Sequence, residues 1–249
     1  TAMAIGGFED FKTEILLETS EGNVSLEGTV NGDEFYFVNS TLEIQELDLG
    51  KILDLPQLEP ISLVSHLEGK GSGWYNVEGQ MKVDFGNLAW EDIDLSQLGL
   101  SLSAKDTVAT LQAVFSKENV DFDFNATAKI DTVSPELNFL LDVKKLNTQA
   151  IGATKQDIDT NFKISGELSG KPENMTAGIE IFDGFFHLEG RDFPIGLIKV
   201  DSRLSDQLSD LKVQSDFLNG FFTVNSSVSN LSLSLENYFN KVIVGYSEM

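Results

Sequence analysis

His66 and His187 are the only histidines of this 249-residue chain, and histidine is the side chain best suited to acid–base catalysis near neutral pH. Each stands in a strand-like run, "LVSHLEG" and "FFHLEG". A catalytic or metal site would need carboxylates converging on these rings, and the spacing of the sequence promises none. We therefore predict two histidines on strands near the surface or near turns, with no catalytic and no metal-binding role.

Three acidic pairs have the spacing i, i+2, which could bring two carboxylates together for calcium binding or glycoside hydrolysis. They are Asp92/Asp94, Asp121/Asp123 and Asp157/Asp159. No "DxDxDG" loop accompanies them, and in a strand this spacing puts both members on one face, opposite the apolar one. We interpret the pairs as carboxylates on a solvated strand face.

Other catalytic motifs are missing from the sequence. The stretch "GKGSG" (Gly69–Gly73) lacks the spacing of a phosphate-binding loop and precedes no helical pattern, so a hairpin turn is expected there. There is no "GxSxG" serine elbow, and a chain without cysteine has no thiolate and no disulfide. The residues predict neither an enzyme nor a cofactor.

The charge balance is strongly acidic: 40 acidic and 17 basic side chains give a formal net charge of -23. Such a field repels phosphate backbones, so no nucleic-acid partner is expected. No apolar run approaches the length of a membrane-spanning helix, and "TAMAIGGF" lacks the regions of a signal peptide. Any anchor or export signal is expected to lie outside this chain.

The stretch "VDFDFNATAKID" (120–131) shows the pattern that dominates the chain. Val120, Phe122 and Phe124 fall on one face of an extended strand, and Asp121 and Asp123 fall on the other. "QMKVDF", "LGLSLSA", "PELNFLLDV", "GIEIF" and "NLSLSLE" alternate in the same way, with polar turn residues between the runs. The sequence predicts an all-β protein, with one or two short helices at 47–55 and 235–243.

Two segments of the chain resemble each other. The region around Gly69–Gly86 is similar to Gly166–Gly184 at an offset of 166 − 69 = 97, and Leu111–Asn125 is similar to Leu211–Asn225 at an offset of 211 − 111 = 100. The shared order of glycine turn, strand, loop and paired strands predicts internal repeats of about 98 residues, at about 40–135 and 136–235, within a single segment 1–249.

The apolar face of these strands must pack against something, and the alternating pattern does not say whether this is protein or a ligand. Most alternating strands are half buried against protein, so the pattern alone favours the opposite wall of an ordinary β-sandwich. Phenylalanine is frequent, with 18 residues, whereas tryptophan is rare, with 2. An apolar lining of this kind also suits an acyl chain, which needs apolar contact without directional partners.

The chain resembles the TamB/AsmA-like family of Gram-negative envelope proteins, as an internal segment of a long TamB-type member from Bacteroidetes-like bacteria. The resemblance is carried by "STLEIQELDLGKILDLPQLEPISLVSHLEGKGSG", "FDFNATAKIDTVSPELNFLLDVKKLN" and "LKVQSDFLNGFFTVNSSVSNLSLSLENYF", and covers about Phe11 to Phe239. The chain departs from the family in having no N-terminal inner-membrane helix. No part of it matches the C-terminal region that meets the outer-membrane barrel.

This resemblance implies an elongated, twisted antiparallel sheet folded into a taco-like groove that conducts phospholipid between the inner and outer membranes. It implies a periplasmic location, an anchor in the inner membrane, a role in outer-membrane biogenesis and an outer-membrane barrel of the TamA type as partner. The residues expected to line the groove are Met81, Val83, Phe85, Leu98, Leu100, Leu102, Val120, Phe122, Phe124, Leu137, Phe139, Leu141, Ile179, Ile181, Phe222, Leu231 and Leu233.

Two other functions are compatible with the sequence. One is a structural module, either an adhesin-like stalk or a chaperone-like scaffold that offers sheet edges to outer-membrane proteins. The other is a lipopolysaccharide carrier of the LptA/LptC type, which is close to the phospholipid groove in its chemistry.

Overall fold

The structure is a computed structural model that describes residues 2–6, 10–31, 36–71, 76–90, 93–131, 133–152, 154–171, 174–188, 190–205 and 209–224. Well over half of these residues lie in β-strands. The strands of the N-terminal half are β1 (Ala2–Gly6), β2 (Asp10–Thr19), β3 (Gly22–Asn31), β4 (Tyr36–Leu47), β5 (Ile61–Lys70), β6 (Glu78–Asn87), β7 (Ala89–Trp90), β8 (Ile93–Asp94), β9 (Gly99–Lys105) and β10 (Val108–Lys117). Those of the C-terminal half are β11 (Val120–Lys129), β12 (Glu136–Asn147), β13 (Asp159–Lys171), β14 (Asn174–Leu188), β15 (Arg191–Pro194), β16 (Ile198–Ser205), β17 (Ser209–Ser215) and β18 (Asn219–Val224).

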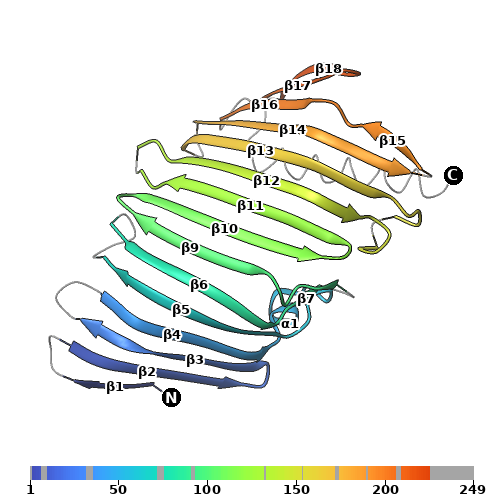
Figure 1. Ribbon diagram of the computed structural model, residues 1–249. Coiled ribbons are helices and arrows are strands. Elements are labelled where there is room, and N and C mark those ends of the chain that lie inside the picture. The colour runs from blue at the N-terminus through green and yellow to red at the C-terminus, as the bar shows by residue number, and fades with distance from the viewer. Residues whose placement is uncertain are drawn as a thin grey trace.

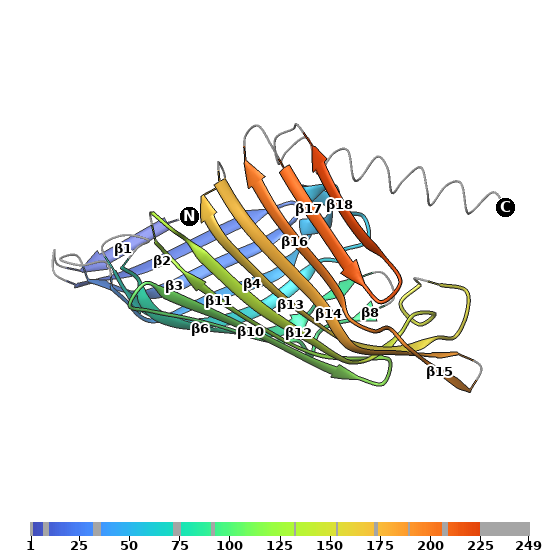
Figure 2. The same ribbon diagram turned by 90° about the horizontal axis from the view of Figure 1, so that it is seen from above.

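Nearly all of these strands form one antiparallel sheet. Its order is β1-β2-β3-β4-β5-β6-β9-β10-β11-β12-β13-β14-β16-β17-β18, with β15 paired beside β14. Strand order therefore follows chain order, with β7, β8 and β15 outside the main path. Figure 1 shows the strands stacked from β1 near the N-terminus to β18 at the other end, and Figure 2 shows the strand direction turning steadily along the stack. A right-handed twist of this kind is the ordinary consequence of L-residue sterics.

The sheet is a single layer in the part of the chain that the structure describes. The pairs of strands in extensive contact there are the hydrogen-bonded neighbours, and no second sheet or helix layer packs on either face. The β-sandwich that the strand pattern alone favours is therefore not what the described residues form. Each strand draws its stability from the strands on either side.

Irregular pairing interrupts the sheet near the strand ends. The register shifts between Asp121 and Phe122 where β11 pairs with β12, and between Asn161 and Lys163 where β13 pairs with β14. The first shift leaves one residue of β12 unpaired, and the second leaves one residue of β13 and two of β14 unpaired. Such irregularities increase the local twist and bend the strand. At the second shift Asp183 has φ 52°, in the left-handed region.

The only α-helix among the described residues is α1 (Leu49–Leu53). The Asp48 side chain caps it by accepting a hydrogen bond from the Lys51 amide at 2.8 Å, and Asp54 ends it with φ 58°. Beside α1 the chain forms the β7–β8 hairpin, whose Ala89 is buried together with Ile61 at the start of β5. In Figure 1, α1 and the β7–β8 hairpin lie at one end of strands β4 to β6.

The prediction of an all-β protein built on a twisted antiparallel sheet is confirmed, and α1 falls within the first stretch where a short helix was expected. The second expected helix, 235–243, lies outside the described residues. The repeat of about 98 residues stays a prediction; the sheet runs on without a break at its proposed boundary, where β11 pairs with β12. Within the described ranges no helix has the length and apolar character needed to cross a membrane.

Candidate functional site

The strand register places the expected lining residues on one face of the sheet, which we call the dry face. Met81 lies opposite Leu102, Phe124 opposite Leu141, and Gly166 between Phe139 and Ile179. Leu98 is half-buried just before β9, and Phe222 lies opposite Leu211 at the edge of the sheet. Leu231 and Leu233 lie outside the described residues. That any of these residues contacts a lipid stays a prediction.

Apolar residues continue directly across the sheet from strand to strand. Successive register partners form one row of twelve residues on twelve strands, which we call the central apolar row. It comprises Ile15, Leu26, Leu42, Ser65, Val83, Leu100, Ala113, Phe124, Leu141, Ile164, Ile181 and Ile198. Ser65 is its one polar member. Eleven strand spacings of about 4.8 Å make the row about 53 Å long.

The exposure of the dry face varies along its length. Phe115, whose ring contacts that of Phe122, is 1% exposed, and Val83 is 5% exposed. Leu17 is 54% exposed, Ile15 41% and Ile179 39%. Exposed apolar side chains thus lie toward both ends of the dry face, and apolar surface exposed in patches marks binding sites. The dry face is thus an apolar surface that the described chain covers only in part.

Phenylalanine rings contact one another in the middle of the dry face. The rings of Phe115 and Phe122 have centroids 5.9 Å apart, and those of Phe124 and Phe139 are 6.1 Å apart, both pairs tilted. These are favourable separations for aromatic pairs. The Phe139 ring also lies over Gly166, in the space that a Cβ at that position would need.

Sequence reasoning missed several members of the dry face, Phe115 among them. In "LQAVFS" the adjacent Val114 and Phe115 are both apolar, so alternation does not say which of them faces inward. The register does: Phe115 lies opposite Phe122, and Val114, 49% exposed, lies on the other face opposite Asp123.

The opposite face, which we call the wet face, carries the pair Asp121/Asp123. Lys144 lies 2.8 Å from Asp123 and 3.7 Å from Asp121, and the hydrogen bond with Asp123 raises the pKa of this lysine. Asp94 lies away from the wet face, on β8 of the separate two-stranded sheet, and is 2.6 Å from Lys117, which shares the dry-face register of Phe115. The Lys117 hydrogen bond, followed by those from Ser96, holds the pKa of Asp94 well below the ordinary value. These carboxylates are engaged by lysines.

The third pair, Asp157/Asp159, binds an amide: Asn147 donates hydrogen bonds of 2.6 Å and 3.1 Å to its two members. Asp92, a member of the first pair, lies outside the described residues. In the described part of the chain, no group of three or more histidine, cysteine or acidic residues has the geometry to hold a metal ion.

The two histidines lie apart on strands β5 and β14. His66 Nδ1 is 3.4 Å from the Thr41 hydroxyl, and His187 Nδ1 is 2.6 Å from an Asp192 carboxylate oxygen. The His187 side chain is 42% exposed and that of Asp192 67%. Lys82 lies opposite His66 in the register, and Glu68 and Gln80 line the same hollow as this ring. That neither histidine has a catalytic role stays a prediction. The "GKGSG" stretch links the paired strands β5 and β6, and its Ser72 and Gly73 lie outside the described residues.

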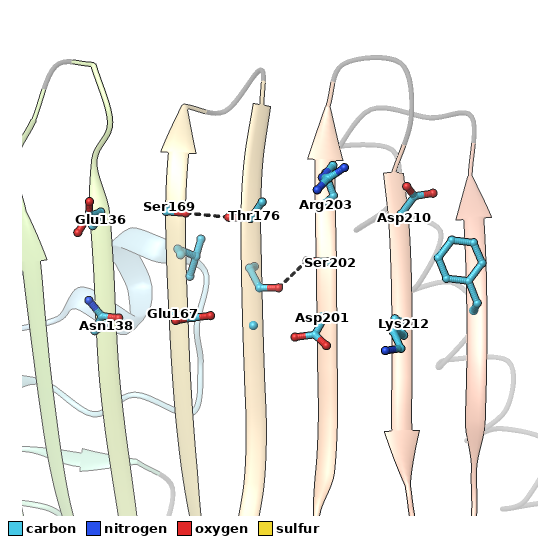
Figure 3. A pocket seen from close by; sticks show the side chains of 14 residues that line it. Glu136, Asn138, Glu167, Ser169, Thr176, Asp201, Ser202, Arg203, Asp210 and Lys212 are labelled. Atoms are coloured by element: carbon cyan, nitrogen blue, oxygen red, sulfur yellow. Dashed lines mark hydrogen bonds between the residues drawn. The ribbon is translucent and has the colours of Figure 1, made fainter.

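The wet face is hollowed where strands β12 to β18 meet. Figure 3 shows this hollow, which has a volume of about 570 Å³ and is lined by side chains from six strands. A smaller hollow of about 500 Å³ lies between His66 and Gln112 on the same face. Both are lined largely by polar side chains, so they differ from the apolar groove that the sequence predicted.

Comparison with models of known protein families, with curated proteins and with solved structures finds no match to this chain.

Proposed function

We propose that the dry face binds the acyl chains of phospholipid and lets them pass along the sheet, without catalysis. The observation that carries this proposal is the central apolar row, which continues over twelve strands with no second protein layer on the described residues. Burying apolar surface stabilises a complex by about 25 cal/mol per Å², without directional partners. Because such a surface holds its ligand without directional hydrogen bonds, a bound acyl chain can move along it.

The central apolar row is long enough to hold several acyl chains end to end, or one that moves along it. The hydrocarbon core of a bilayer is about 30 Å thick, so one acyl chain extends about 15 Å. A row of about 53 Å is longer than three such chains end to end. The net charge of -23 repels anionic head-groups from the wet face, which favours the acyl chain as the part that is held.

In the cell we propose that this chain is one section of a periplasmic bridge that carries phospholipid from the inner to the outer membrane. The resemblance of the sequence to the TamB/AsmA-like family supports this periplasmic role. It also supports an outer-membrane barrel of the TamA type as a partner of other sections of the bridge. The serial strand order supports the periplasmic role as well, since further strands can extend the sheet without altering the surface.

The experiment compares two variants that place the same new charge one residue apart. Phe124→Asp puts a carboxylate into the central apolar row, and Asn125→Asp puts it on the wet face of the same strand. Lipid retained per chain is measured by native mass spectrometry of the purified protein, together with the thermal midpoint. We expect Phe124→Asp to lose bound lipid, because burying an unpaired carboxylate costs several kcal/mol, and Asn125→Asp to keep it.

The stability of the Phe124→Asp variant separates an open face from a sealed core. An open face can hydrate the new charge, so the variant should stay folded, whereas in a sealed core it would lose about 3 to 5 kcal/mol or more. A parent chain that carries no lipid from a lipid-containing host, or equal retention in both variants, would contradict lipid binding and favour a structural module.

A further inference from the structure

The hollow on the wet face is lined by acidic, basic and aromatic side chains. A register row crosses it from Asn138 on β12 through Glu167, Gly178, Asp201 and Lys212 to Phe221 on β18. Gly178 has no side chain, and carboxylate oxygens of its neighbours Glu167 and Asp201 lie 3.3 Å and 3.7 Å from the place that a Cβ there would take. Six strands at about 4.8 Å give the hollow a length of about 24 Å.

The charged side chains in the hollow do not neutralise one another across the strands. Arg203 lies opposite Asp210 in the register and Lys212 opposite Asp201, but neither pair is within 4.0 Å in the described structure. Elsewhere on this face opposed charges do meet, as Lys199 meets Glu180 at 2.8 Å. Neither Arg203 nor Lys212 has a hydrogen bond or ion pair in the described structure. Both cations are therefore available to a ligand.

The composition of the lining selects the class of ligand. Glu136, Glu167, Asp201 and Asp210 outnumber Arg203 and Lys212, so the lining has a formal charge of −4 + 2 = −2, which disfavours phosphate and other anions. The two cations disfavour a bare metal ion. Carboxylates accept hydrogen bonds and the cations donate them, so the wall suits a ligand whose groups do both, as hydroxyl groups do.

Phe221 supplies an apolar contact in this polar setting. It lines the hollow and is 67% exposed, although its position lies on the wet face opposite Lys212. An aromatic ring held at the surface beside hydrogen-bonding groups matches a molecule with an apolar face and a polar rim. A pyranose ring has both: axial C–H groups on its faces and hydroxyls around its edge.

We propose that the hollow binds a saccharide chain. Phe221 stacks on a sugar ring, Arg203 and Lys212 donate to its hydroxyl oxygens, and Glu167 and Asp201 accept from its hydroxyl groups. A volume of about 570 Å³ lies within the range of small-molecule sites and exceeds the need of one ring, so an oligosaccharide is the fitting ligand. The site is on the opposite face from the central apolar row, so it does not depend on lipid binding.

The test is isothermal titration of the full chain with two probes, a β-1,4-linked glucose hexamer and a β-1,4-linked N-acetylglucosamine hexamer. Binding of either probe is expected, and the stronger one identifies whether the acetamido group is recognised. Inorganic phosphate serves as the anion probe. Failure of both hexamers to bind, or displacement of a bound hexamer by phosphate, would overturn the proposal.

Two variants locate the binding, each with a matched control. Phe221→Ala removes the stacking ring and is paired with Phe217→Ala, a phenylalanine outside the hollow that is 76% exposed against 67% for Phe221. Arg203→Gln removes a charged donor and is paired with Arg191→Gln, the only other arginine of the chain, on β15. We expect each hollow variant to weaken binding about tenfold or more and each control to bind as the parent does. Equal affinity in a variant and its control would place the sugar elsewhere and refute the assignment.

Discussion

Gly166 leaves room for the Phe139 ring, which occupies the space that a larger side chain would need. Gly166→Ala would drive a methyl group into that ring, and overpacking of this kind costs about 1 to 3 kcal/mol. We expect a lower urea midpoint for this variant. Gly99→Ala is the control, because its added Cβ meets the Val114 carbonyl at an ordinary 3.7 Å. Equal midpoints for the two variants would show that Phe139 moves aside without cost.

The ion pair between Asp94 and Lys117 makes the stability of the fold depend on pH. The hydrogen bond from Lys117, aided by Ser96, lowers the folded-state pKa of Asp94 below the unfolded value of about 3.9. A depressed carboxyl pKa stabilises the fold at pH above about 4, and this contribution is lost as the pH falls through the folded-state pKa.

Lys117→Met should therefore raise the pKa of Asp94 toward about 3.9, measured by NMR titration of its carboxyl carbon. Lys105→Met, at an exposed lysine on β9, should leave that titration unchanged. An Asp94 that titrates near 3.9 in the parent protein would refute the interaction.

At the scale of strands, alternation predicts which residues share a face but not which strands meet. The faces of β6, β11 and β12 follow from period-two patterns in "QMKVDF", "VDFDFN" and "PELNFLLDV". The wet-face hollow does not follow, because it depends on a register that brings Asn138, Gly178 and Phe221 into one row from strands up to 83 residues apart (221 − 138 = 83). Cross-strand register is set by turn lengths and bulges, which the sequence specifies only weakly.

Dividing the chain tests whether its halves are independent. A cut between Ser134 and Pro135 separates β11 from β12 and leaves each half with an additional unpaired edge. We expect halves that are soluble but melt lower and more gradually than the whole chain, measured by circular dichroism, and that recover part of the lost transition when mixed. Halves that melt as cooperatively as the parent would show two autonomous repeats, against a continuous sheet.

The whole molecule is long in the direction in which its strands stack. Fifteen strands in one path give fourteen spacings of about 4.8 Å, or about 67 Å. A compact domain of 249 residues has a radius of gyration of about 18 Å. Small-angle X-ray scattering should give a clearly larger radius and an asymmetric distance distribution. A radius of about 18 Å would mean that the sheet closes on itself in solution.

The strict match between strand order and chain order also governs how this protein acquires its structure. Since every strand pairs with one made shortly before it, the extensive contacts join strands that are neighbours or near neighbours along the chain, which lowers the contact order for a β-protein. Each new hairpin can add to an edge already formed, so the loop-closure entropy per step stays small and nearly constant however long the sheet becomes. The chain can therefore fold progressively from one end as it emerges from a ribosome or an export channel, with each completed strand as the template for the next.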